Sequence, residues 1–86
     1  MLTANQGEAA ARDIQDWAIR IASQVDHGIH VDVSAEADSR TYVIRLVSGA
    51  RVLIFRLSES QVRTDGREAE CERTLLRKIK DLSNLL

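Results

Sequence analysis

The stretch RTYVIRLVSGARVLIFRL, residues 40–57, predicts two β-strands joined by a tight turn. Apolar residues alternate along both halves of this stretch, and such alternation is typical of strands whose successive side chains point to opposite faces. Glycine is favoured in short turns because it adopts positive φ without steric cost. The stretch therefore predicts an antiparallel hairpin that turns at Ser48-Gly49, and this hairpin decides the fold class.

A third strand is predicted just before the hairpin, in IHVDVSA at residues 29–35. A turn at Ala37-Asp38 pairs Val33 with Tyr42, because directly opposed residues of an antiparallel pair point to the same face. The hairpin turn in the same way pairs Ile44 with Leu53. The two turns agree on one apolar sheet face, which is made of Ile29, Val31, Val33, Tyr42, Ile44, Leu46, Leu53, Phe55 and Leu57.

Amphipathic helices are predicted on both sides of the three strands. Residues 7–27 carry apolar residues at helical spacing, and Gly28 is a candidate left-handed helix stop. Asp65 and Glu68 have the spacing of a capping box for a second helix. The apolar stripe of that helix consists of Cys71, Leu75, Ile79, Leu82 and Leu86. The sequence thus predicts an α+β fold of order α-β-β-β-α: a two-layer sandwich with a three-stranded antiparallel meander and both helices on one face.

Size and composition favour one small globular domain over residues 1–86, with residues 1–6 frayed. The chain has 86 residues, 44% of them hydrophobic and 29% charged, with no proline and a net charge of −1. A single cysteine excludes an internal disulfide framework. The chain begins without a basic segment followed by an apolar run, and it contains no apolar segment of the ~20 residues needed to span a bilayer. We expect a cytoplasmic protein without a membrane partner.

The hairpin carries apolar residues on its second face as well as on the core face. This second face presents Val43, Arg45, Val47, Val52, Ile54 and Arg56, and both helices are already needed on the other side. An aliphatic patch flanked by charge is typical of a surface that contacts a partner. This second apolar face has two alternative explanations. The β-branched residues are there only because they favour strands, or one helix crosses over and covers this face. The third strand of the predicted sheet is also an edge strand, and it contains no proline or lysine that would prevent it from pairing with another strand.

Residues able to support catalysis or metal binding do not form a convincing set. The segment DHGIHVD, residues 26–32, contains His27 and His30, but zinc sites take three or four convergent ligands. One candidate catalytic grouping combines His30 with Asp32 against Arg45. Cys71 lies on a helical apolar stripe, which favours a buried hydrophobic role. We therefore expect no enzyme activity, no metal and no cofactor.

The element order is similar to that of double-stranded-RNA-binding domains, whose helices also lie on one sheet face. The resemblance implies RNA contacts from the loop between the first two strands and from lysines that start the second helix. In this sequence the loop is residues 36–39, EADS, and the second helix opens with Asp65, Glu68, Glu70 and Glu72. Acidic residues thus occupy the positions where phosphates would bind, so the resemblance concerns element order and not RNA binding.

Two function classes follow from these patterns. The first is a small non-catalytic protein-interaction module that forms a homodimer through the open sheet face or the third-strand edge, or that binds another protein. The alternative is a nucleic-acid-binding domain that uses the arginine-rich hairpin, because residues 40–63 contain five arginines and one glutamate.

Overall fold

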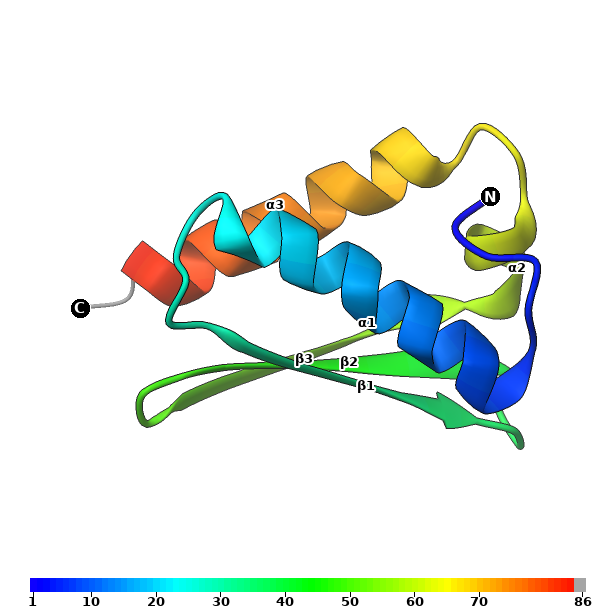
Figure 1. The fold of residues 1–86 in the computed structure, drawn as a ribbon, viewed down its shortest axis with the longest axis horizontal. Coiled ribbons are helices and arrows are strands. Elements are labelled where there is room, and N and C mark those ends of the chain that lie inside the picture. The colour runs from blue at the N-terminus through cyan, green and yellow to red at the C-terminus, as the bar shows by residue number, and fades with distance from the viewer. Residues whose placement is uncertain (85–86) are drawn as a thin grey trace.

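The structure, a computed structural model, describes residues 1–84 and confirms the predicted α+β fold. The elements are α1 (Gly7–Ser23), β1 (His30–Glu36), β2 (Thr41–Ser48), β3 (Arg51–Ser58), α2 (Glu59–Arg63) and α3 (Glu68–Asn84). The three antiparallel strands lie in the order β1-β2-β3, and α1 and α3 cover the same face of the sheet (Figure 1). The short helix α2 was not predicted. Leu86, the last residue of the predicted stripe, lies outside the described residues.

The strand register differs from the predicted one by two residues at each turn. Val33 pairs with Ile44 instead of Tyr42, and Ile44 pairs with Phe55 instead of Leu53. The first connection contains residues 37–40 and not two residues, and the second turn is formed by residues 49–50. Because side chains alternate with a period of two, a shift of two leaves every side chain on its predicted face.

The core lies between the sheet and the two long helices. Six of the nine predicted sheet residues are buried: Ile29, Val31, Tyr42, Ile44, Leu46 and Leu57. Helix α3 adds Cys71, Leu75, Ile79 and Leu82, whereas α1 contributes mainly small side chains in Ala10, Ala11, Ala18 and Ala22. These alanines let the α1 backbone approach the sheet closely, which brings the helix against β1.

Helix α1 ends earlier than predicted, and Gly28 does not stop it. The helix ends at Ser23, and Val25, which lies within the predicted helical stretch of residues 7–27, is exposed. The positive-φ glycines of the described chain are Gly7, Gly49 and Gly66, so Gly28 is not left-handed. Its amide donates a 2.8 Å hydrogen bond to Asp26 Oδ1, which forms the turn into β1.

Gly49 is the glycine that the β2–β3 turn requires. It has a φ of +60° at the first of the two turn positions, and Ala50 follows without positive φ, as in a type II′ hairpin turn. We expect Gly49→Ala to destabilise the fold by about 1 to 2 kcal/mol, the cost of a left-handed residue with a Cβ. No neighbouring atom lies within 4 Å of the added carbon, so the cost is intrinsic to the backbone.

Gly28→Ala is the matched control, because its new Cβ meets only the flexible Asp26 carboxylate at 3.2 Å. A change below about 0.5 kcal/mol is expected there in urea denaturation. Equal losses for the two variants would contradict this assignment of the turn.

The N-terminal residues, which the sequence suggested would be frayed, make specific contacts in the structure. Leu2 donates its amide to the Val62 carbonyl at 2.8 Å, so the segment lies against α2, as Figure 1 shows. Thr3 is buried and its hydroxyl donates to Asp13 Oδ2 at 2.6 Å. Arg63 donates to the Asn5 carbonyl at 2.6 Å. Helix α2, which begins with a capping box of Ser58 and Gln61, thus holds this segment in place.

Two side-chain hydrogen bonds, the larger effect from Thr3 and the smaller from Asn5, lower the pKa of Asp13 below its ordinary value of 3.8. A carboxylate with a lowered pKa in the folded state stabilises the fold above pH ~4, and this contribution is lost as the pH falls through the folded pKa. We expect Asp13 to titrate below pH 3.8, and Thr3→Val to move its midpoint upward, in NMR titration of the carboxyl carbon.

Thr74→Val serves as the control, because the Thr74 hydroxyl bonds only to the Glu70 carbonyl of its own helix. An Asp13 midpoint that does not change in Thr3→Val would show that this hydrogen bond does not set the pKa.

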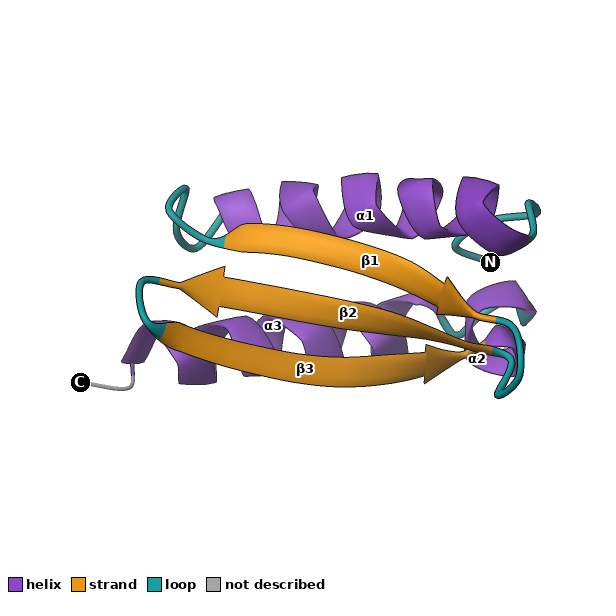
Figure 2. Cartoon of the chain, turned by 90° about the horizontal axis from the view of Figure 1, so that it is seen from below, coloured by secondary structure: helices purple, strands orange, loops and turns teal. Residues whose placement is uncertain are grey.

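The two outer strands of the sheet differ in what lies beside them. In Figure 2, α1 runs along β1 and extends past that margin of the sheet, whereas β3 forms the opposite margin. The Val33 amide of β1 donates to the Gln15 side chain of α1 at 3.2 Å. Helix α1 therefore shields the β1 edge with its body and with one direct hydrogen bond.

Candidate interaction surface

The six predicted surface residues lie together on the sheet face that neither long helix covers. They form three directly opposed pairs, Val43 with Arg56, Arg45 with Ile54, and Val47 with Val52. We call this set the outer-face patch. Figure 2 views the sheet from this side, with the helices behind the strands. The alternative that a helix crosses to this face is therefore wrong, because α1 and α3 both pack on the opposite face.

Exposure within the outer-face patch increases from β2 to β3. Val43 and Val47 on the central strand are half-buried, whereas Val52 and Ile54 on the outer strand are 50% and 52% exposed. These two are the most exposed large apolar residues among the described residues. A pair of β-branched side chains that keep half their surface in water retains an unused hydrophobic driving force of about 1 kcal/mol or more each.

The two arginines of the patch pair with acidic residues of the same chain. Arg45 lies 3.7 Å from the carboxylate of Asp32, its directly opposed residue on β1. Arg56 reaches diagonally across β2 to Glu36 at 3.9 Å. All four side chains are largely exposed, so each pair contributes little to stability, about 0 to 1 kcal/mol. The sequence did not anticipate these pairs, and the register explains the first of them by placing Asp32 opposite Arg45.

Backbone direction shows which groups β3 leaves unpaired. In antiparallel strands, alternate residues direct their N–H and C=O groups to one side. The Val33 amide points away from β2 to Gln15, so odd residues of β1 face outward and even residues of β2 bond to β3. Hence the odd residues of β3 bond to β2. The even ones, Val52, Ile54 and Arg56, direct their backbone groups to the open edge.

The end of β3 supports this assignment. Ser58, the next even residue, donates its amide to the Gln61 side chain at 2.8 Å instead of to β2. The open edge therefore runs from Val52 to Arg56, and the capping box of α2 closes it at Ser58.

Apolar residues on the other face of β3 are also incompletely covered. Leu53 and Phe55 belong to the predicted core face, yet they are only partly buried at the margin of the core. The corresponding residues of the central strand, Ile44 and Leu46, are fully buried. Thus β3 carries half-covered apolar side chains on both faces beside an unpaired backbone edge, a combination typical of a strand that lies inside a larger sheet.

The histidine and aspartate residues of the 26–32 segment do not converge on one point. His30 lies opposite Val47 and not opposite Arg45 as predicted, and His27 is exposed in the turn before β1. The candidate catalytic grouping of His30 and Arg45, which the sequence did not favour, is therefore not formed in this register. Within residues 1–84, no group of three His, Cys, Asp or Glu side chains is placed to hold one metal ion.

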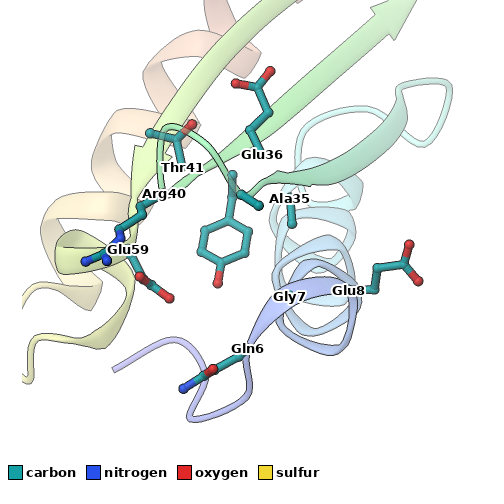
Figure 3. Close-up of a pocket in the computed structure, with 10 residues that line it drawn as sticks. Gln6, Gly7, Glu8, Ala35, Glu36, Arg40, Thr41 and Glu59 are labelled. Atoms are coloured by element: carbon teal, nitrogen blue, oxygen red, sulfur yellow. The ribbon is translucent and has the colours of Figure 1, made fainter.

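A pocket of about 530 Å³ lies where the β1–β2 turn meets the start of α1. It was not predicted, because its walls come from three separate segments. Figure 3 shows Gln6 and Gly7 across from Arg40 and Glu59. Ser39 donates to the Glu36 carboxylate, and Arg63 donates to the Glu59 carboxylate. These contacts hold the acidic groups in place.

Cys71 is buried on α3, as its apolar stripe predicted. Burial raises the pKa of its thiol, and the neighbouring Glu70 carboxylate raises it further. Both effects disfavour the reactive thiolate.

The five arginines of residues 40–63 are distributed over several parts of the molecule. Arg40 lies in the β1–β2 turn with a φ of 53°, and Arg51 begins β3. Arg63 bonds to the N-terminal segment, and the remaining two pair with acids on the outer face. The hairpin arginines therefore do not line one continuous basic stripe.

Comparison of the chain with protein-family models, with curated proteins and with solved structures gives no match. Among the described residues, no helix is both long enough and apolar enough to cross a membrane. The fold and the surface of β3 are thus the observations from which a function is inferred.

Proposed function

We propose that this chain is a small non-catalytic protein-interaction module that self-associates as a homodimer through the surface of β3. The observation that carries the proposal is the coincidence of exposed Val52 and Ile54 with the unpaired backbone edge of the same strand. Each feature alone is common on monomers. Together they give one surface both exposed apolar side chains and unpaired backbone hydrogen-bonding groups, and each of these favours association.

A second copy of the chain is the partner that β3 fits best. Closed two-fold dimers are the commonest oligomers, and a two-fold interface requires a surface that complements itself. An antiparallel strand edge meets this requirement, because each copy supplies the same donors and acceptors in reverse order. The intramolecular pairs of Arg45 and Arg56 leave no excess charge on the patch that would repel a second copy.

The direct test is the molar mass measured by light scattering after size exclusion, over a range of protein concentrations at moderate salt. A mass near twice 9.6 kDa that falls toward 9.6 kDa on dilution is the expected result. A strict monomer at all concentrations would overturn the proposal. If that monomer bound double-stranded RNA with steep salt dependence, the nucleic-acid alternative would replace it.

A further inference from the structure

We infer that two copies pair edge to edge along β3, antiparallel, with the two-fold axis at Ile54, so that their sheets join into one. This inference rests on the proposed homodimer and specifies its geometry. Each three-stranded sheet would contribute its β3 to the centre of a six-stranded sheet. In that arrangement Val52, Ile54 and Arg56 of each copy donate and accept backbone hydrogen bonds across the axis.

The arginine pairs favour edge pairing over packing of the two outer faces. Face packing would bury Arg45 with Asp32 and Arg56 with Glu36, whose side chains are 45% to 70% exposed. Removing ion pairs from water costs more than their mutual attraction returns unless further hydrogen bonds are added. Edge pairing adds backbone hydrogen bonds and leaves all four charged groups in water.

The position of the axis follows from the length of the open edge. Ser58 is excluded because its amide is bonded to Gln61, so the strand available for pairing is residues 51–57, whose midpoint is Ile54. Moving the axis toward Arg56 would oppose arginine with arginine, which is destabilising. Moving it toward Val52 would pair the strand with the residues 49–50 turn of the other copy.

Self-complementarity on both faces supports the same axis. On the outer face, Ile54 lies opposite its own copy, and Val52 lies opposite the aliphatic stem of Arg56. On the helix-bearing face, Leu53 lies opposite Phe55 of the second copy. These two residues are only partly buried in one chain, and the pairing covers both. All the half-covered apolar residues of β3 thus gain a neighbour in one arrangement.

Hydrogen exchange of the intact protein tests the edge pairing without any substitution. At concentrations where light scattering shows dimer, we expect the amides of Val52, Ile54 and Arg56 to exchange at least about tenfold more slowly than in dilute monomer. A dimer in which these three amides exchange freely would overturn the inference and leave the proposed homodimer intact. A monomer would overturn both.

Cysteine cross-linking tests the register, in a Cys71→Ala background that unfolds cooperatively. Ile54→Cys should form a disulfide-linked dimer under mild oxidation, because directly opposed Cα atoms lie about 5.5 Å apart. Val52→Cys alone should not, since its copies would lie roughly 13 Å apart along the strands. Val52→Cys combined with Arg56→Cys should cross-link again. Efficient linkage by Leu53→Cys or Phe55→Cys instead would move the axis and overturn the assigned register.

Discussion

Ile54→Glu is expected to give a folded protein that stays monomeric where the unaltered chain is dimeric. In the proposed pairing each copy loses the burial of an aliphatic side chain, and two carboxylates are placed opposite each other. The combined loss is about 3 kcal/mol or more, which raises the dissociation constant more than a hundredfold. Light scattering gives the mass, and circular dichroism checks that the fold is retained.

Ile19→Glu is the matched control for this variant. Ile19 is also an exposed isoleucine, 41% exposed, but it lies on α1, away from the outer face of the sheet. The same change of residue type there should leave the dimer mass unaltered. A dimer that persists in Ile54→Glu would exclude β3 as the contact, whatever the behaviour of the control.

Ile44→Ala is expected to destabilise the fold by about 2 to 5 kcal/mol, a large share of the total stability of so small a domain. Ile44 lies on the central strand and is fully buried between the sheet and the helices. Truncation leaves a cavity that the packed core around it fills only partly. Urea denaturation at concentrations that keep the protein monomeric measures the free energy of unfolding.

Ile54→Ala provides the comparison on the neighbouring strand and the opposite face. In the monomer its cost should stay within about 0.5 kcal/mol, because the side chain is already half in water. At dimer concentrations the same variant should lose additional stability, since association stabilises only the native state. Equal losses for Ile44→Ala and Ile54→Ala in the monomer would contradict the assignment of the two sheet faces.

The sheet faces could be predicted from the sequence, but the register could not. Alternation assigns Ile44 to the core and Ile54 to the outer face for either position of the turn. The predicted and the observed registers differ by two residues, which leaves each side chain on the same face. The exact partners depend on where the chain turns, and adjacent small residues in Ser48-Gly49-Ala50 permit two similar turns. The ion pair of Arg45 with Asp32 depends in the same way on the β1–β2 register, which the connection of residues 37–40 sets, so it could not be foreseen.

Features formed by segments that are distant in the sequence could not be predicted either. The contact of Leu2 with Val62 joins the N-terminal segment to α2, far along the chain, and no local pattern marks it. The pocket between Gln6 and Arg40 likewise needs the tertiary arrangement. The capping box of Ser58 and Gln61 was readable in principle, but helix α2 is too short to give a periodic signal.

The unequal margins of the sheet have a consequence for the size of any assembly. A strand edge on each side would make the molecule bifunctional, and bifunctional units polymerise into fibrils. Here α1 and Gln15 shield the β1 margin, while β3 is open. In the sense used for step-growth polymers the chain is monofunctional, so pairing at β3 consumes its reactive end. Two copies paired at β3 therefore present no second open strand edge, and growth terminates at two units. Helix α1, which helps to complete the core, is also the element that prevents further addition.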